Sequence, residues 1–91
     1  MNREELGQLL DRAGLDKRFY SLDGPAHHSE SYSLVNDGSV WKVLYKERGR
    51  FEQIAGSLSE DQACKLMYKL LDQAFSLDLR RAATLTAQRK A

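Results

Sequence analysis

The feature that most constrains the fold is a pair of β-prone segments joined by the tetrapeptide Asn36–Ser39. Within ESYSLVNDGSVWKVLYK, both flanking runs are rich in Val, Tyr and Trp, and apolar residues alternate with polar ones. Asp-Gly at the centre of a tight turn is a strong hairpin signal, because glycine accepts the positive φ that such a turn imposes. The pattern predicts two antiparallel strands, at Ser31–Asn36 and Val40–Lys46.

A second turn follows where Lys-Glu-Arg-Gly-Arg interrupts the alternation. Gly49 lies where a hairpin needs positive φ, and the next β-prone run predicts a third strand at Arg50–Gly56. The three strands form an antiparallel meander in this interpretation. Its apolar surface comes mainly from alternating residues of the first two strands, which are Tyr32, Leu34, Trp41, Val43 and Tyr45.

A long amphipathic helix is predicted after the strands. Ser59 and Gln62 have the spacing of a capping box, and two acidic residues occupy the first turn. Apolar residues then recur at helical spacing on one stripe, at Ala63, Leu66, Met67, Leu70, Leu71, Ala74 and Phe75. We expect this stripe to cover the meander and to bury Trp41 beneath Leu66–Leu70. The segment after Phe75 either continues the helix or restarts it at Asp78.

A shorter helix is predicted at the N-terminus. Asn2 is placed to cap it, Glu5 to complete a capping box, and Gly14 to end it in a left-handed conformation. The connector Leu15–Glu30 has the only proline and reads as a loop, in which a short extended piece could form at Phe19–Leu22. The fold class is therefore α+β, with an N-terminal helix, a three-stranded antiparallel meander and a C-terminal helix packed on the sheet.

The composition fits one small cytoplasmic domain covering residues 1–91. A chain of 91 residues can build one core, its single cysteine cannot form an internal disulfide, and no apolar run is long enough for a membrane span. The N-terminus does not have the pattern of a secretion signal. The net charge of +1 divides into −3 for residues 1–79 (10 basic, 13 acidic) and +4 for residues 80–91, a stretch that we interpret as a frayed basic tail.

Residues with catalytic or metal-binding chemistry do not form a recognisable site in the sequence. His27 and His28 lie near Asp23 and Glu30, but adjacent histidines seldom converge on one ion, so we predict a polar loop without metal or cofactor. Nearby serines lack a nucleophile elbow. A metal-free nuclease using His28 with the Glu47-Arg48 pair is the catalytic alternative, and solvated strand and turn positions explain the same residues more simply. We therefore expect no enzymatic activity.

Binding to single-stranded nucleic acid is the main alternative function. Basic residues gather on one hairpin, with aromatic residues between them, as in sheets that stack bases; they are Lys42, Lys46, Arg48, Arg50, Tyr32, Trp41, Tyr45 and Phe51. However, alternation places Trp41 and Tyr45 on the face opposite the lysines, where they are expected to join the core. Glu47 and Glu52 would also repel phosphate.

Three segments in order, FYSLDG, SYSLVNDGSVWKVLYKERGRFEQI and LSEDQACKLMYKLL, carry a resemblance to a known family. The chain resembles the small immunity proteins encoded beside bacterial polymorphic toxins, including those of contact-dependent growth inhibition systems. The resemblance extends over about Phe19–Leu71. Glu47, Arg48 and Gly49 match a Glu-Arg-Gly turn, and Ser59-Glu60 with Ala63-Cys64 matches a helix start. Unlike many immunity proteins against nucleases, this chain is not markedly acidic.

The resemblance implies a non-enzymatic cytoplasmic protein that binds one cognate toxin C-terminal domain, often a nuclease, and blocks its active site. The partner is then a protein, and neither a small-molecule substrate nor a membrane is expected. An inhibitor needs exposed charged anchors, which the sequence offers in one turn and one loop. The predicted toxin-binding residues are Asp23, His27, His28, Glu30, Glu47, Arg48 and Arg50.

Overall fold

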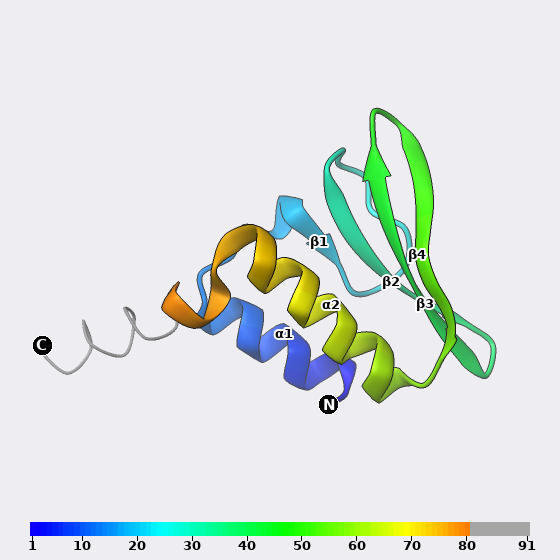
Figure 1. Ribbon diagram of the computed structural model, residues 1–91, viewed down its shortest axis with the longest axis horizontal. Coiled ribbons are helices and arrows are strands. Elements are labelled where there is room, and N and C mark those ends of the chain that lie inside the picture. The colour runs from blue at the N-terminus through cyan, green and yellow to red at the C-terminus, as the bar shows by residue number, and fades with distance from the viewer. Residues whose placement is uncertain (81–91) are drawn as a thin grey trace, which may run out of the picture.

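Two helices lie side by side on one face of a twisted four-stranded sheet (Figure 1). The computed structural model describes residues 1–80. Along the chain the elements are α1 (Arg3–Arg12), the 3-10 turn η1 (Lys17–Phe19), β1 (Tyr20–Ser21), β2 (Ser31–Asp37), β3 (Val40–Glu47), β4 (Arg50–Leu58) and α2 (Glu60–Phe75). The strands are arranged in the order β1-β2-β3-β4. The predicted α+β architecture with a C-terminal helix packed on the sheet is confirmed.

The sheet has four strands rather than the three predicted. The extended piece expected near Phe19–Leu22 forms β1, a two-residue strand that pairs in parallel with the start of β2. A strand of two residues is too short to show an alternating pattern in the sequence. Its pairing with β2 depends on the path of the loop that connects the two strands. The other pairs, β2 with β3 and β3 with β4, are antiparallel as predicted.

The first hairpin turn is shifted by one residue from the prediction. Asp37 pairs with Val40, so the central residues are Gly38 and Ser39 rather than Asp37 and Gly38. Gly38 has a φ of 73°, which matches a two-residue turn with glycine at its first central position. The shift lengthens β2 to Asp37 without changing which side chains share a face.

Both helices are capped largely as the sequence predicts. Asn2 accepts a hydrogen bond from the Glu5 N–H, whereas the reciprocal capping box is complete at α2, between Ser59 and Gln62. Gly14 follows α1 with a φ of 68°. At its other end α2 stops after Phe75, because Ser76 takes a left-handed conformation, and residues 77–80 are helical again. The chain therefore restarts a helix here, and the predicted basic tail lies, apart from Arg80, outside the described residues.

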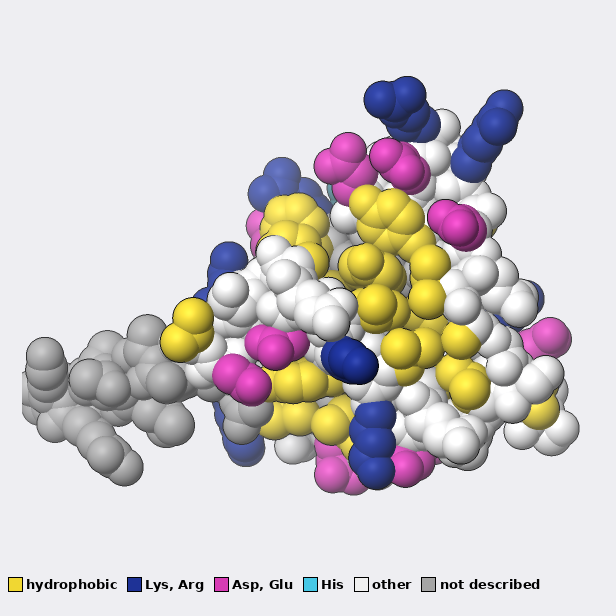
Figure 2. All heavy atoms as spheres, viewed as in Figure 1, with side chains coloured by type: hydrophobic (Ala, Val, Ile, Leu, Met, Phe, Trp, Pro, Cys, Tyr) yellow, Lys and Arg dark blue, Asp and Glu magenta, His cyan; other side chains and the backbone are white. Residues whose placement is uncertain are grey.

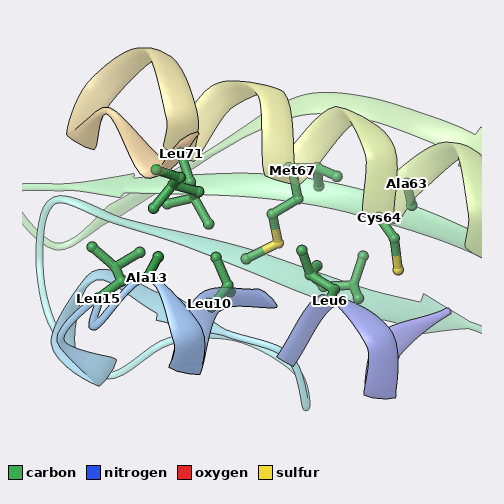
Figure 3. Packing of buried hydrophobic residues seen from close by; sticks show 11 residues of the cluster. Leu6, Leu10, Ala13, Leu15, Ala63, Cys64, Met67 and Leu71 are labelled. Atoms are coloured by element: carbon green, nitrogen blue, oxygen red, sulfur yellow. The ribbon is translucent and has the colours of Figure 1, made fainter. Parts of the chain in front are cut away.

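The core is a three-way junction of α1, α2 and the sheet. Leu6 and Leu10 of α1 point toward Met67 and Leu71 of α2 (Figure 3). Fully buried hydrophobic residues in this cluster are Leu6, Leu10, Leu34, Val43, Ala63, Cys64, Met67, Leu71 and Leu77. Because α2 packs on α1 as well as on the sheet, its buried stripe is rotated about the helix axis relative to the predicted stripe.

Several side chains of the predicted helix–sheet interface differ from expectation as a result. Ala74 is exposed, Leu66 and Leu70 are only half-buried, and Cys64 is fully buried instead. Trp41 is half-buried near the start of β3, where it packs against the core cluster but does not lie in it. The fully buried residue of β3 is Val43, opposite Leu34 of β2.

The segment 22–30 covers part of the opposite face of the sheet. Ser31 and Ser33 point away from the helices by alternation and are fully buried. The Ser33 hydroxyl accepts a hydrogen bond from the Ala26 N–H at 2.9 Å, and the Ser31 hydroxyl donates to the His28 carbonyl. These bonds hold the loop against β2 and satisfy polar groups that burial would otherwise penalise.

Candidate functional site: the end of the second hairpin

The hairpin of β3 and β4 extends beyond the helices, and its turn stands clear of α1 and α2 (Figure 1). Glu47 pairs with Arg50, so Arg48 and Gly49 form a two-residue loop. Both loop residues have positive φ, 51° for Arg48 and 80° for Gly49, as a type I′ turn requires. The positive φ predicted for Gly49 is confirmed.

Arg48 is the unusual residue of this turn. A side chain with a Cβ is disfavoured in the left-handed region, and the first central position of a type I′ turn is normally Asn, Asp or Gly. Holding Arg48 there costs on the order of 1–3 kcal/mol. The arginine is exposed and takes part in no ion pair within residues 1–80. A contribution of its side chain to folding therefore does not explain why arginine occupies this position.

An open groove of about 710 Å³ lies at this end of the hairpin. It is lined by side chains from both strands and the turn, which are Tyr45, Glu47, Arg48, Arg50, Phe51 and Glu52. In Figure 2, basic side chains lie at the top of the molecule, above a group of acidic and hydrophobic side chains. We call these six residues together with Glu30 the hairpin-end site.

A tyrosine pair surrounded by carboxylates forms the helix-side face of the site. The rings of Tyr45 and Tyr32 lie 4.8 Å apart at an angle of 47°. Partial burial raises the pKa of Tyr45, and the negative charges of Glu47 and Glu30 raise it further. Glu52 is the register partner of Tyr45 and therefore shares its face. Three carboxylates thus lie around one half-buried tyrosine.

The other face of the hairpin end combines an apolar and a basic side chain. Phe51 is 45% exposed, although it is large and aromatic. The Lys46 Nζ lies 5.2 Å from the centroid of its ring, a cation–π distance. The same ammonium donates to the His27 carbonyl at 3.1 Å. Lys46 is therefore occupied by the histidine loop and is not a free phosphate anchor.

The structure brings most of the predicted binding residues to one end of the sheet. Glu47, Arg48 and Arg50 line the groove, and the Glu30 N–H donates to the Lys46 carbonyl at 2.6 Å, which places Glu30 beside them. Glu30 also has a positive φ of 58°. The exposed His27 and His28 adjoin this end through their backbone carbonyls, which bond to Lys46 and Ser31.

Asp23 does not belong to this site. Its carboxylate forms an ion pair with Arg3 of α1 at 2.7 Å, and the neighbouring Gly24 bonds to the Leu34 carbonyl near the middle of β2. The loop runs along β2, so its two ends lie at different places on the sheet. The structure therefore separates Asp23 from the other predicted toxin-binding residues, and its own contact with a toxin stays a prediction.

Sequence reasoning missed three members of the site. Tyr45 was predicted to join the core, Glu52 was considered only as a repulsive charge, and Phe51 only as a base-stacking residue. Tyr45 is two residues before Glu47, so alternation already placed both on one face. The sequence does not indicate how far along β3 the helices reach. That distance determines at which residue this face of the strand becomes exposed.

The chemistry for nucleophilic or metal-assisted catalysis is not assembled in the part of the chain that the structure describes. No three His, Cys, Asp or Glu side chains of residues 1–80 are grouped to hold a metal ion. Ser31 and Ser33 are buried and bonded to loop backbone, not to a histidine ring. Burial raises the pKa of Cys64 to about 11, which keeps the thiol protonated and unreactive.

No family model matches the chain, and no curated protein or solved structure shows significant similarity to it. Within residues 1–80, none of the helices has the length and apolar character needed to cross a membrane.

Proposed function

We propose that this chain is an immunity protein, which binds a cognate toxin domain in the cytoplasm and neutralises it without catalysis. The observation that carries the proposal is Arg48, an exposed arginine held at positive φ on the tip of a projecting hairpin. Backbone strain concentrates at functional positions because selection for folding alone would remove it. The resemblance of the sequence to toxin-immunity proteins includes this same Glu-Arg-Gly turn.

The hairpin-end site has the composition of a protein-binding surface. Aromatic residues and arginine are enriched at the centres of interfaces and account for much of their affinity. Here Tyr45, Phe51 and Arg48 supply these side chains, while carboxylates supply the opposite charge. A toxin that acts at few copies must be bound at about nanomolar affinity or better, close to −12 kcal/mol. Such affinity usually requires about 800 Å² of contact on each partner, more than the groove alone offers.

A nuclease domain is the partner class that the site fits best. Nucleases bind phosphate with cationic side chains, and Glu30, Glu47 and Glu52 can pair with such cations at the mouth of an active site. None of the three carboxylates forms an ion pair within the described residues. They are consequently available to a partner without the loss of an internal contact.

The same carboxylates weigh against the alternative function, binding of single-stranded nucleic acid. Glu47 and Glu52 line the same groove as Arg48 and Arg50 and would repel phosphate, and Lys46 is already bonded to the histidine loop. We expect negligible binding of single-stranded RNA or DNA at physiological ionic strength. Micromolar or tighter binding that falls steeply with salt would favour this alternative.

The proposal is tested with the double variant Glu47→Ala/Arg48→Ala. Exposed charges contribute little to stability, so its thermal unfolding should stay near that of the unmodified protein. Its affinity for the C-terminal domain of the protein encoded by the adjacent upstream gene should fall by at least 100-fold. The double variant Glu4→Ala/Arg12→Ala, which removes one charge of each sign from exposed positions of α1, is the matched control and should bind normally. Unchanged affinity of the hairpin variant would place the binding surface elsewhere.

A further inference from the structure

The outer edge of β4 is the least protected part of the sheet. β4 is the last strand in the order β1-β2-β3-β4, so one of its edges has no partner strand in the described chain. It is nine residues long, and residues 50–54 are all exposed. The opposite edge of the sheet is the two-residue β1, beside the 3-10 turn. An unpaired strand edge is a row of backbone donors and acceptors that fits another strand.

The turn geometry determines which peptide groups face outward. The type I′ turn makes Glu47 and Arg50 a hydrogen-bonded pair, and such pairs alternate with non-bonded ones along an antiparallel ladder. Phe51 and Gln53 are therefore at non-bonded positions, and their N–H and C=O groups point away from β3. The carbonyl of Lys46, opposite Phe51, supports this alternation, because it accepts from Glu30 on the β2 side.

Irregular backbone limits the part of the β4 edge that can pair with another strand to the first residues of β4. The register of β4 shifts after Gln53, where Ile54 has no partner on β3, and shifts again near Ser57, which has a φ of 55°. Bulges of this kind twist an edge and interrupt the addition of a further strand. The regular segment is Arg50–Gln53, which directly adjoins the hairpin-end groove.

We propose that the toxin domain adds an extended strand to β4 along Arg50–Gln53, an inference that rests on the function proposed above. The new strand would pair with the outward peptide groups of Phe51 and Gln53. A lysine or arginine of that strand would lie opposite Glu52, and an apolar side chain would cover the exposed ring of Phe51.

A second copy of this chain does not fit the same edge. Pairing Phe51 of one copy with Gln53 of the other places the two Glu52 carboxylates directly opposite each other, which is destabilising. Pairing Phe51 with Phe51 avoids this clash, but only Arg50 to Glu52 can pair before the turn begins. Charge and length therefore favour a strand from a different protein.

Amide hydrogen exchange tests the proposal residue by residue. In the free protein the Phe51 and Gln53 amides should exchange rapidly, while the Glu52 amide, paired with Tyr45, should be protected. After addition of the C-terminal domain encoded by the upstream gene, exchange at Phe51 and Gln53 should slow by at least tenfold. A complex in which these two amides stay unprotected would overturn the strand addition and leave the proposed function intact.

Two further outcomes also decide the matter. If no complex forms with that toxin domain, both the proposed function and this inference are overturned. If Phe51 and Gln53 become protected with rising protein concentration in the absence of the toxin, the edge pairs with a second copy of this chain, and the proposed pairing with a toxin strand is wrong.

A proline variant separates the backbone group from the side chain. Phe51→Pro removes an outward N–H that makes no bond to β3, and proline is tolerated on edge strands. Phe51→Ala removes the same ring and keeps the N–H. Binding should weaken at least tenfold more in Phe51→Pro than in Phe51→Ala, and equal affinities would overturn the proposal. If Phe51→Pro fails to fold, the exchange experiment on the unmodified protein still decides.

Discussion

The two halves of the sheet differ in what covers them, although the same strands run through both. In the half beneath the helices, Leu34 and Val43 are completely buried against the α1 and α2 side chains. In the half that forms the hairpin end, Tyr45 is only half-buried and Phe51 is 45% exposed. Burial of apolar surface is the main source of folding free energy, so stability should be concentrated in the covered half. The projecting half can then carry strained backbone, charge and exposed aromatic surface at little cost to stability.

The largest expected effect compares two aliphatic truncations, one in each half. Leu34→Ala removes buried methyl groups from the centre of the core and should lower the free energy of unfolding by about 2–5 kcal/mol. Ile54→Ala removes a similar volume from β4, but this side chain is 40% exposed, so the loss should be below about 1 kcal/mol. Urea denaturation of both variants measures the difference. Comparable losses would mean that an exposed position of β4 contributes as much to stability as a buried position of β2.

A smaller change in the free energy of unfolding, an increase rather than a decrease, is expected at the strained turn. Arg48→Gly removes the Cβ that disfavours positive φ and should raise the free energy of unfolding by about 1 kcal/mol. The same change removes the guanidinium and should weaken toxin binding. Arg48→Ala keeps the strain and should lose affinity without the gain in stability. A glycine variant that is both more stable and fully able to bind would show that Arg48 has no role in recognition.

The smallest effect concerns the protonation of Tyr45. Partial burial, with the charges of Glu47 and Glu30, raises its pKa above the ordinary 10.0, so the folded state favours the neutral phenol. The stabilising contribution is complete below pH 10 and is lost as the pH rises through the folded-state pKa. Glu47→Gln should lower the Tyr45 pKa, as followed by its ring resonances in NMR titration. The Tyr20 pKa is raised mainly by burial, with Asp11 and Asp16 adding to it, so it should not respond.

The hairpins and caps could be predicted because their signals are local. Gly49 at positive φ, the antiparallel register of β3 with β4 and the capping box at Ser59 follow from neighbouring residues in the sequence. The site was predictable to the extent that it is a turn: Glu47, Arg48 and Arg50 lie in the groove as expected for exposed charges at a hairpin tip. Glu30 joins them only because the loop folds back along β2.

Alternation indicated the face of a strand but not how far along the strand that face is covered. β3 has eight residues, and its C-terminal end continues to a turn that stands clear of α1 and α2 (Figure 1). The helices therefore cover only part of the strand. Tyr45 and Val43 have the same pattern in the sequence, yet Tyr45 lines the open groove at the hairpin end and Val43 lies in the core.

The sequence by itself determined the order of helices and strands, both hairpin turns to within one residue, and the start of each helix. These features depend on contacts between residues close together in the chain. Only the tertiary structure decided that β1 joins the sheet, that Cys64 rather than Ala74 faces the core, and that Asp23 pairs with Arg3 away from the other predicted binding residues. Each of these depends on how α1, α2 and the loop settle on the sheet, because packing between distant segments is set by the shapes of both surfaces.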